Sequence, residues 1–369
     1  MEEISTRSGS GLIIGKFMPP HLGHQYLVDF AREQVDRLTV LVCSIAAEPI
    51  PGTLRCKWMR EMFPDVDVVH VTDENPQEPH EHSEFWQIWL DTIRRVVPRG
   101  PDYLFASEDY GWKLSDMLGA QYVPVDHARS LVPISGSRLR ERPMENWGFI
   151  PPCVRPHFAR RVCVFGPEST GKSTLARRLA EHYQTVYAAE YARGLLDFKH
   201  GRCDFDDIPR IARGHVASEE ALARQANRVL FCDTDLITTV IWSEILFGEC
   251  PEWIRREADR RGYDLYLLMD IDTPWVPDPQ RYLPNDRESF LARCEAELTS
   301  RGRAYVKIGG SWTERFRRAC EAVEPLLSDR WRPAERPTAL RKPPGQTERR
   351  DERKSGSRSP GCADGIPGR

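Results

Sequence analysis

The chain lacks three features that mark common protein classes. Its 10 cysteines form no C-x-x-C pair, which argues against a zinc knuckle, a redox dithiol or a disulfide framework. No apolar run approaches the roughly 18 residues that a membrane span needs, and the polar start MEEISTRSGS is unlike a signal peptide. The net charge of -3 supplies no basic field for nucleic acid. We therefore expect a cytoplasmic protein that binds neither membranes nor nucleic acids.

Hydrophobic patterning predicts two domains of the same class. A length of 369 residues suits two domains, at roughly 150 residues each. Short apolar runs at 12–14, 38–43, 66–71, 103–106 and 122–125 alternate with helix-like stretches, and a second series begins at Arg161. This alternation is typical of parallel sheets. The predicted fold class is α/β, with two doubly wound parallel-sheet domains.

Composition changes along the chain indicate where the domains end. Residues 141–158 are rich in proline, and the segment after Trp331 is rich in Arg, Pro and Gly with almost no large apolar side chain. We predict a flexible N-terminus over 1–10, a first domain over 11–150, a linker over 151–160, a second domain over 161–331 and a disordered tail over 332–369.

A phosphate-binding loop opens the second domain. Residues 166–173 read GPESTGKS, between the strand-like RVCVF and the helix-like STLARRLAEHY. This fits G-x-x-x-x-G-K-[ST], in which backbone amides surround the phosphates, the lysine reaches the β and γ phosphates, and the serine hydroxyl binds Mg²⁺. The predicted ATP-binding residues are Gly166, Glu168, Ser169, Thr170, Gly171, Lys172, Ser173 and Thr174.

Carboxylates elsewhere in the second domain suggest a kinase. Asp233 ends the apolar run RVLFCD and is our candidate second Mg²⁺ ligand beside Ser173, whereas Asp235 could serve only as a helix cap. A kinase that acts on a hydroxyl also needs a base. Glu190, Asp204 and Asp233 all stay open for that role.

Two further segments are candidates for substrate binding. AAEYAR places Glu190, Tyr191 and Arg193 together and predicts a nucleoside pocket, although a plain Glu190–Arg193 surface pair is an equal alternative. The proline-rich DTPWVPDPQRYLPNDRESF could form a lid over the transferred phosphate, or only a solvated loop. Its candidate residues are Trp275, Asp278, Arg281 and Arg287.

The first domain carries a different phosphate motif. GKFMPPHLGH, residues 15–24, places two histidines three residues apart at a predicted helix start, where imidazoles can donate hydrogen bonds to phosphate. ISGSRLR, residues 134–140, predicts a second anion-binding helix start. We expect ATP binding and catalysis from Gly15, Lys16, Phe17, His21, Gly23, His24, Ser135, Ser137, Arg138 and Arg140.

These motifs resemble known families. G-x-F-x-P-x-H-x-G-H with I-S-x-[ST]-x-x-R is similar to the HxGH nucleotidyltransferases, and SEFWQIWLDTIR, SEDYG and VDHAR resemble nicotinamide mononucleotide adenylyltransferases. An HxGH domain followed by a P-loop domain with EYAR, DTD and TPWVPDPQR resembles the bifunctional NadR-type family. Ser137 stands where many relatives have threonine. Only ten residues precede the first predicted strand, so we expect no helix-turn-helix DNA-binding domain.

The resemblance implies two reactions with ATP as co-substrate and Mg²⁺ as cofactor. The second domain would phosphorylate nicotinamide riboside, and the first would join the resulting mononucleotide to AMP, giving NAD and pyrophosphate. Trp86 or Trp89 would stack on the nicotinamide ring, although core packing is an equal alternative for each. Two rival functions are an adenylyltransferase for pantetheine phosphate or flavin mononucleotide fused to a deoxynucleoside kinase, and a non-catalytic ATP or NAD sensor. A homo-oligomer is compatible with either domain.

Overall fold

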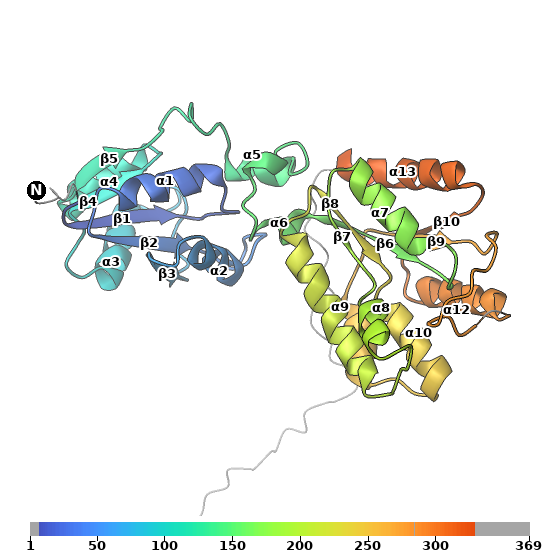
Figure 1. Ribbon diagram of the computed structural model, residues 1–369. Helices are drawn as coiled ribbons and strands as arrows, with labels where there is room; N and C mark the ends of the chain where they lie inside the picture. Colours follow the sequence, from blue (N-terminus) through green and yellow to red (C-terminus); the bar gives the residue numbers. More distant parts are fainter. Residues whose placement is uncertain (1–6, 284, 329–369) are drawn as a thin grey trace, which may run out of the picture. The chain divides into compact units, whose positions relative to one another are not determined.

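The computed structural model describes residues 7–283 and 285–328 and contains two five-stranded sheets (Figure 1). All strand pairings within the two sheets are parallel, which confirms the predicted fold class. The predicted tail and residues 1–6 of the predicted flexible N-terminus lie outside the described residues. Within the described ranges, no helix has the length and apolar character needed to cross a membrane.

The first sheet has the strand order β3-β2-β1-β4-β5. Its strands are β1 (Ser10–Gly15), β2 (Arg37–Cys43), β3 (Asp67–Val71), β4 (Tyr103–Ala106) and β5 (Gln121–Pro124). The chain runs outward from β1 to β3 and then returns to the other side of β1. The carboxyl ends of β1 and β4 therefore form the switch point, where doubly wound sheets bind their ligands.

Alternate residues of the first sheet face opposite helix layers. Ile13 and Val40 pack with α1 (Leu22–Arg32) and α2 (Gly52–Met62), whereas Leu12 and Leu41 pack with α3 (Phe85–Val96) and α4 (Tyr110–Leu118). Since both faces of each strand are covered, the strands appear in the sequence as short continuous apolar runs.

The segment that follows β5 is folded and packed. It contains α5 (Gly136–Glu141), a 3-10 helix (Trp147–Phe149) and α6 (Arg155–Phe158), so the predicted linker over 151–160 includes a helical turn. Val154 and Phe158 are buried in one cluster with Trp58 and Trp147. Burial of these apolar side chains stabilises the fold of a proline-rich stretch that composition alone identifies as a linker.

The second sheet has the strand order β10-β9-β6-β8-β7. Its strands are β6 (Arg160–Phe165), β7 (Tyr187–Ala188), β8 (Val229–Asp233), β9 (Leu265–Met269) and β10 (Tyr305–Ile308). The central strand β6 leads into the phosphate loop, and its Val164 is paired with Asp233 of β8. This register places Asp233 directly beside the start of the loop.

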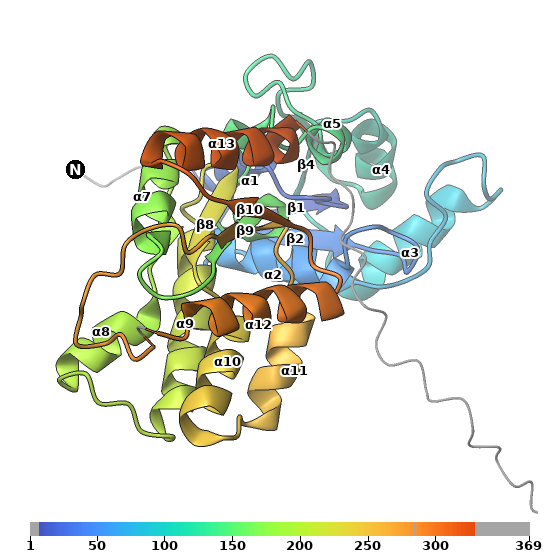
Figure 2. The same ribbon diagram turned by 90° about the vertical axis from the view of Figure 1, so that its right-hand side faces the viewer.

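Helices cover both faces of the second sheet (Figure 2). The helices α7 (Lys172–His182) and α13 (Trp312–Ser328) pack on one face. The other face is covered by α9 (Asp207–Ala223), α10 (Leu236–Phe247), α11 (Glu252–Arg260) and α12 (Arg287–Ser300). The short α8 (Tyr191–Phe198) follows β7 and carries the EYAR segment.

Two candidate phosphate-binding sites

A cavity at the carboxyl edge of the first sheet gathers most of the residues predicted there. Residues from the GKFMPPHLGH turn, from α3 and from the start of α5 share its wall. The predicted residues that line it are Gly15, Lys16, Phe17, His21, Gly23, His24, Trp86, Trp89, Ser135, Ser137 and Arg140. The two halves of the nucleotidyltransferase motif, more than a hundred residues apart in the sequence, thus meet at the switch point of the sheet.

The two histidines of the motif lie against each other. His21 has an extended backbone and is the N-cap of α1, and its Nδ1 accepts the backbone N–H of His24 at 3.3 Å. The rings stack with centroids 3.7 Å apart and an interplanar angle of 21°. Because Nδ1 of His21 is an acceptor, the neutral ring carries its proton on Nε2, which is therefore a donor.

Both imidazoles are neutral at physiological pH. Burial lowers the pKa of His21 to about 3, and the nearby charge of Arg129 acts in the same direction. Burial, followed by the electrostatic interactions with His21 and Arg129, holds the pKa of His24 well below its usual value. The histidines can therefore donate hydrogen bonds to phosphate, while the positive charge of the cavity comes from Lys16, Arg129 and Arg140.

Two arginines hold the turn that follows β1. The fully buried Arg55 of α2 donates to the carbonyl of Lys16, and Arg140 of α5 donates to the carbonyl of Met18. Arg140 also donates to the Ser137 hydroxyl at 3.2 Å. These bonds fix the backbone of the turn that lines the cavity. The sequence carries no motif that marks Arg55, so its position could not be anticipated.

The two tryptophans of α3 both line the cavity, but their contacts differ. The indole N–H of Trp89 donates to the carbonyl of Pro76 at 2.9 Å, which fixes that ring. The Lys113 ammonium lies 4.6 Å from the centroid of the Trp86 ring. The face of Trp86 is therefore already a cation-binding surface.

Arg138 is absent from the cavity lining. Its backbone N–H is capped by the Ser135 hydroxyl at 3.2 Å, and its guanidinium lies 3.5 Å from the Pro133 carbonyl. The lining residues that had no individual assignment include Tyr110 and Arg129. Both lie in SEDYG and VDHAR, segments that the sequence analysis used for the resemblance without assigning them a role.

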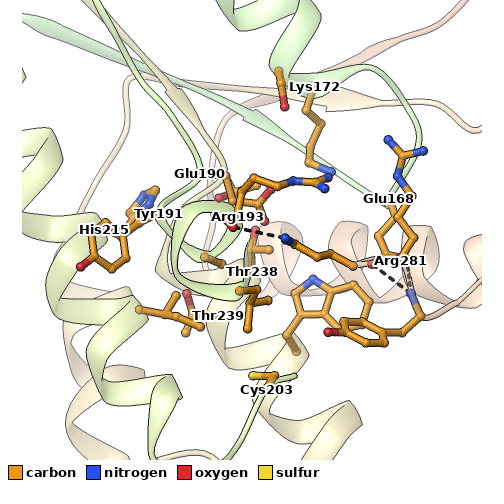
Figure 3. Close-up of a pocket in the computed structure, with 18 of the residues that line it drawn as sticks. Glu168, Lys172, Glu190, Tyr191, Arg193, Cys203, His215, Thr238, Thr239 and Arg281 are labelled. Carbon is orange, nitrogen blue, oxygen red and sulfur yellow. Dashed lines mark hydrogen bonds between the residues drawn. The ribbon is translucent and has the colours of Figure 1, made fainter. Parts of the chain in front are cut away.

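A second cavity opens beside the phosphate loop of the second sheet (Figure 3). Its lining combines residues of the loop, α8, α9, α10 and the proline-rich segment. The predicted residues that line it are Glu168, Ser169, Thr170, Gly171, Lys172, Ser173, Thr174, Glu190, Tyr191, Arg193 and Arg281. The predicted residues Gly166, Asp233, Trp275, Asp278 and Arg287 do not line it.

The phosphate loop is held in shape by its own side chains. The Thr170 hydroxyl and the Lys172 ammonium both donate to the carbonyl of Pro167, each at 2.8 Å. Gly166 has a φ of 132°, and an added Cβ there would lie 3.0 Å from the carbonyl oxygen of Met269. Thr170 is fully buried and supports the loop, whereas Lys172 also lines the cavity.

The carboxylates of β8 have different surroundings. Asp233 is 1% exposed, and its Oδ1 has no hydrogen-bond partner. Burial raises its pKa to about 6, and Glu190 adds to this effect while Lys172 and Ser173 oppose it. Asp235, in contrast, caps α10 by accepting the Thr238 N–H at 3.0 Å. The capping role that the sequence left open for Asp235 is thus present.

The candidate bases also separate in space. Arg193 binds Asp278 with N···O distances of 2.8 and 2.9 Å, so the described structure has this pair in place of a Glu190–Arg193 pair. Asp204 binds Lys199 at 2.7 Å and is absent from the cavity lining. Glu190 lines the cavity, next to the residues of the phosphate loop.

The proline-rich segment is attached to the phosphate loop. The Thr273 hydroxyl donates to the Ser169 carbonyl at 3.0 Å, and the backbone N–H of Tyr282 donates to the Glu168 carboxylate at 3.0 Å. Within this segment Arg281 reaches the cavity, while Arg287 donates to the Thr273 carbonyl at 2.9 Å. The segment is therefore more than a solvated charged loop.

Sequence reasoning missed the inner wall of this cavity. Trp242 and Tyr282 approach each other there, with ring centroids 6.1 Å apart and an interplanar angle of 67°. His215, Thr238 and Thr239 complete the wall. His215, Thr238, Thr239 and Trp242 lie in apolar or helix-like stretches, where side chains that face a cavity and side chains that face a core have the same spacing. Tyr282 instead belongs to the proline-rich segment, in which only its neighbours were candidates.

Known proteins share both halves of this arrangement. A family described as AAA domain matches residues 161–315. A trifunctional NAD biosynthesis/regulator protein NadR of Escherichia coli (strain K12) is 31% identical over 347 residues, which cover 86% of this chain and 83% of the relative.

Solved structures agree on the fold. A NadR protein in complex with NR has a TM-score of 0.71 and 23% identity, covering 89% of this chain and 99% of that one. A NadR protein in complex with NAD and AMP-PNP has a TM-score of 0.70, the same identity and the same coverage. From the identity and coverage shared with the Escherichia coli protein, this chain belongs to the NadR family.

Proposed function

We propose that the protein makes NAD in two steps, as a ribosylnicotinamide kinase and a nicotinamide-nucleotide adenylyltransferase. The observation that carries the proposal is that each parallel sheet has its own cavity at its carboxyl edge, lined by residues of a phosphate-binding motif. The cavity of the second sheet contains the phosphate-loop lysine, Lys172, and the acid Glu190. The cavity of the first sheet contains two neutral histidines among cationic side chains. Such a pair of sites suits two different phosphorus chemistries.

In the kinase site, Glu190 acts as the base for the 5′-hydroxyl of nicotinamide riboside. The hydroxyl proton passes to the Glu190 carboxylate while the oxygen attacks the γ-phosphorus of ATP and the bond to the bridging oxygen breaks, releasing ADP. Lys172 and Arg281 offset the charge of the transferred group. Glu190 suits this role because it lines the cavity, whereas Asp204 is bound to Lys199 elsewhere.

The residues at the end of β8 suit a magnesium ion. Asp233 has a buried oxygen without a partner, and Ser173 at the start of α7 lies close enough to affect its pKa. Together they would hold Mg²⁺, which neutralises charge on the β and γ phosphates when it is bound.

In the adenylyltransferase site, the mononucleotide phosphate attacks the α-phosphorus of ATP and pyrophosphate leaves. The attacking phosphate is already ionised at pH 7, so no base is needed. His21 and His24 donate hydrogen bonds to the phosphorus oxygens, and Lys16 and Arg140 bind the departing pyrophosphate.

Aromatic side chains in each site suit the nicotinamide ring, a flat cation. In the adenylyltransferase site, Trp86 presents the face that the Lys113 ammonium approaches, whereas Trp89 is fixed by Pro76. In the kinase site, Trp242 and Tyr282 stand together on the wall. We therefore assign Trp86 to the mononucleotide and the Trp242–Tyr282 pair to the riboside.

The test is a one-pot reaction. The purified protein is incubated with ATP, Mg²⁺ and one acceptor at a time: nicotinamide riboside, deoxynucleosides, pantetheine phosphate or flavin mononucleotide. Mass spectrometry should find NAD and pyrophosphate only when nicotinamide riboside is the acceptor. Conversion of another acceptor in its place would support a different transferase, and tight ATP or NAD binding without turnover would support a sensor. A cytoplasmic location, a homo-oligomer and the lack of nucleic-acid binding stay predictions from the sequence.

A further inference from the structure

An exposed tryptophan lies against the phosphate loop, outside the kinase cavity. Trp312 is the first residue of α13 and is 45% exposed, although it contacts the loop. Gly171 has a φ of 84°, and an added Cβ there would lie 2.3 Å from Cη2 of Trp312. Trp312 is absent from the cavity that holds Glu190 and Tyr191. The ring of Trp312 therefore offers exposed apolar surface directly beside the phosphate loop.

The surrounding residues hold this ring in one place. Ser311 and Glu314 form a capping box: the Ser311 hydroxyl accepts the Glu314 N–H at 3.4 Å, and Glu314 accepts the Ser311 N–H at 2.8 Å. Arg315 is fully buried and donates to the carbonyls of Gly310 and Thr170, each at 2.9 Å. The start of α13 is thereby tied to the phosphate loop, and α13 packs beside α7 (Figures 1 and 2).

The direction of phosphoryl transfer determines where the ATP base can lie. The γ-phosphate has to face the acceptor beside Glu190, so the nucleoside end of ATP extends away from that cavity. Trp312 borders Gly171 without lining the acceptor cavity, the Arg315 guanidinium lies 5.7 Å from its ring centroid, and the residue is still 45% exposed. We propose that Trp312 is the platform on which the adenine of the kinase ATP stacks, a role that deepens the proposed kinase function and rests on it.

The test compares Trp312→Ala with Trp312→Phe. Base stacking on an aromatic side chain corresponds to about a 5- to 150-fold effect on binding, so the alanine variant should raise the kinase KM for ATP by such a factor. Phenylalanine should recover most of this loss. The KM for nicotinamide riboside and the adenylyl transfer rate should not change, and the unchanged KM for the riboside shows that the kinase domain is folded. Trp112→Ala, which removes a 67% exposed tryptophan of the first domain, is the matched control.

A second measurement separates stacking from support of the loop. Inorganic tripolyphosphate has the phosphates of ATP without its base, and its inhibition constant against ATP in the kinase reaction reports on the loop alone. If Trp312 stacks on the base, the alanine substitution weakens the binding of ATP and leaves the inhibition constant of tripolyphosphate unchanged. Equal weakening of both, or no change in the KM for ATP, overturns the inference. A wild-type protein that does not phosphorylate the riboside would instead refute the proposed function.

Discussion

Arg55 and Glu48 form an ion pair that is closed to solvent, with side-chain exposures of 0% and 7%. One oxygen of Glu48 binds Arg55, and the other has no hydrogen-bond partner and lies 3.8 Å from the Lys16 ammonium. Since Arg55 also holds the Lys16 carbonyl, the pair supports both the backbone and the side chain of one phosphate-site lysine.

Arg55→Met should destabilise the first domain, because it removes the hydrogen-bonded partner of the buried Glu48 carboxylate and leaves only the Lys16 ammonium at 3.8 Å. Loss of one member of such a pair costs about 3–5 kcal/mol. The double variant Arg55→Met/Glu48→Gln should recover part of that loss. Urea unfolding followed by loss of adenylyl transfer measures the effect, with kinase activity of the same chain as the control. Equal destabilisation of the single and double variants would refute the account.

Acid should destabilise the wild-type protein through His21. Its pKa is lowered from 6.5 to about 3 by burial, so below pH 6.5 the unfolded chain binds a proton that the folded chain does not. Stability therefore falls as the pH falls, by about 1.4 kcal/mol per unit and about 2 kcal/mol at pH 5.

His21→Asn provides the matched comparison, since asparagine keeps an oxygen that can cap the His24 N–H. The free energy of unfolding of this variant should decline less between pH 7.5 and pH 5, by about 2 kcal/mol. If the free energies of unfolding of the two proteins changed in parallel with pH, His21 would not bind the extra proton in the unfolded chain, and the account would be wrong.

The two activities should be separable by single substitutions. Lys172→Ala removes the ammonium that lies over the phosphate loop and should abolish riboside phosphorylation, with adenylyl transfer nearly intact. His24→Ala should do the reverse and slow adenylyl transfer roughly 100-fold or more. Separate assays with the riboside and with the mononucleotide measure each step. Loss of both activities in folded Lys172→Ala protein would contradict independent sites.

Much of this architecture could be predicted from the sequence because the motifs have fixed structural contexts. GPESTGKS needs a strand before it and a helix after it, and the structure has β6 and α7 there. The register that places Asp233 beside Val164 follows from strand order, which short apolar runs do not specify. The GPESTGKS motif therefore identified the phosphate loop, whereas the position of Asp233 beside that loop could not be predicted from the sequence.

Residues that act through packing could not be predicted. Trp242 and Trp312 lie on helices whose spacing does not distinguish a ring facing a cavity from a ring facing a core. The folded segment around Val154 is another example, since its prolines indicate a linker while its apolar side chains are buried against Trp58. These positions depend on tertiary contacts between distant segments.

Glu190 and Asp233 should differ in what they contribute to the kinase reaction. Glu190→Gln removes the base while keeping size and hydrogen bonding, so the kcat of riboside phosphorylation should fall about 10²- to 10⁴-fold with little change in Mg²⁺ dependence. Asp233→Asn removes the carboxylate whose Oδ1 is without a partner, so the Mg²⁺ concentration for half-maximal rate should rise. Mg²⁺ titrations of the kinase rate measure both effects, with the KM for nicotinamide riboside as the control that the kinase domain is folded. A large Mg²⁺ shift in Glu190→Gln with unchanged kcat would exchange the two roles, because a metal ligand acts on magnesium affinity and a base acts on the chemical step.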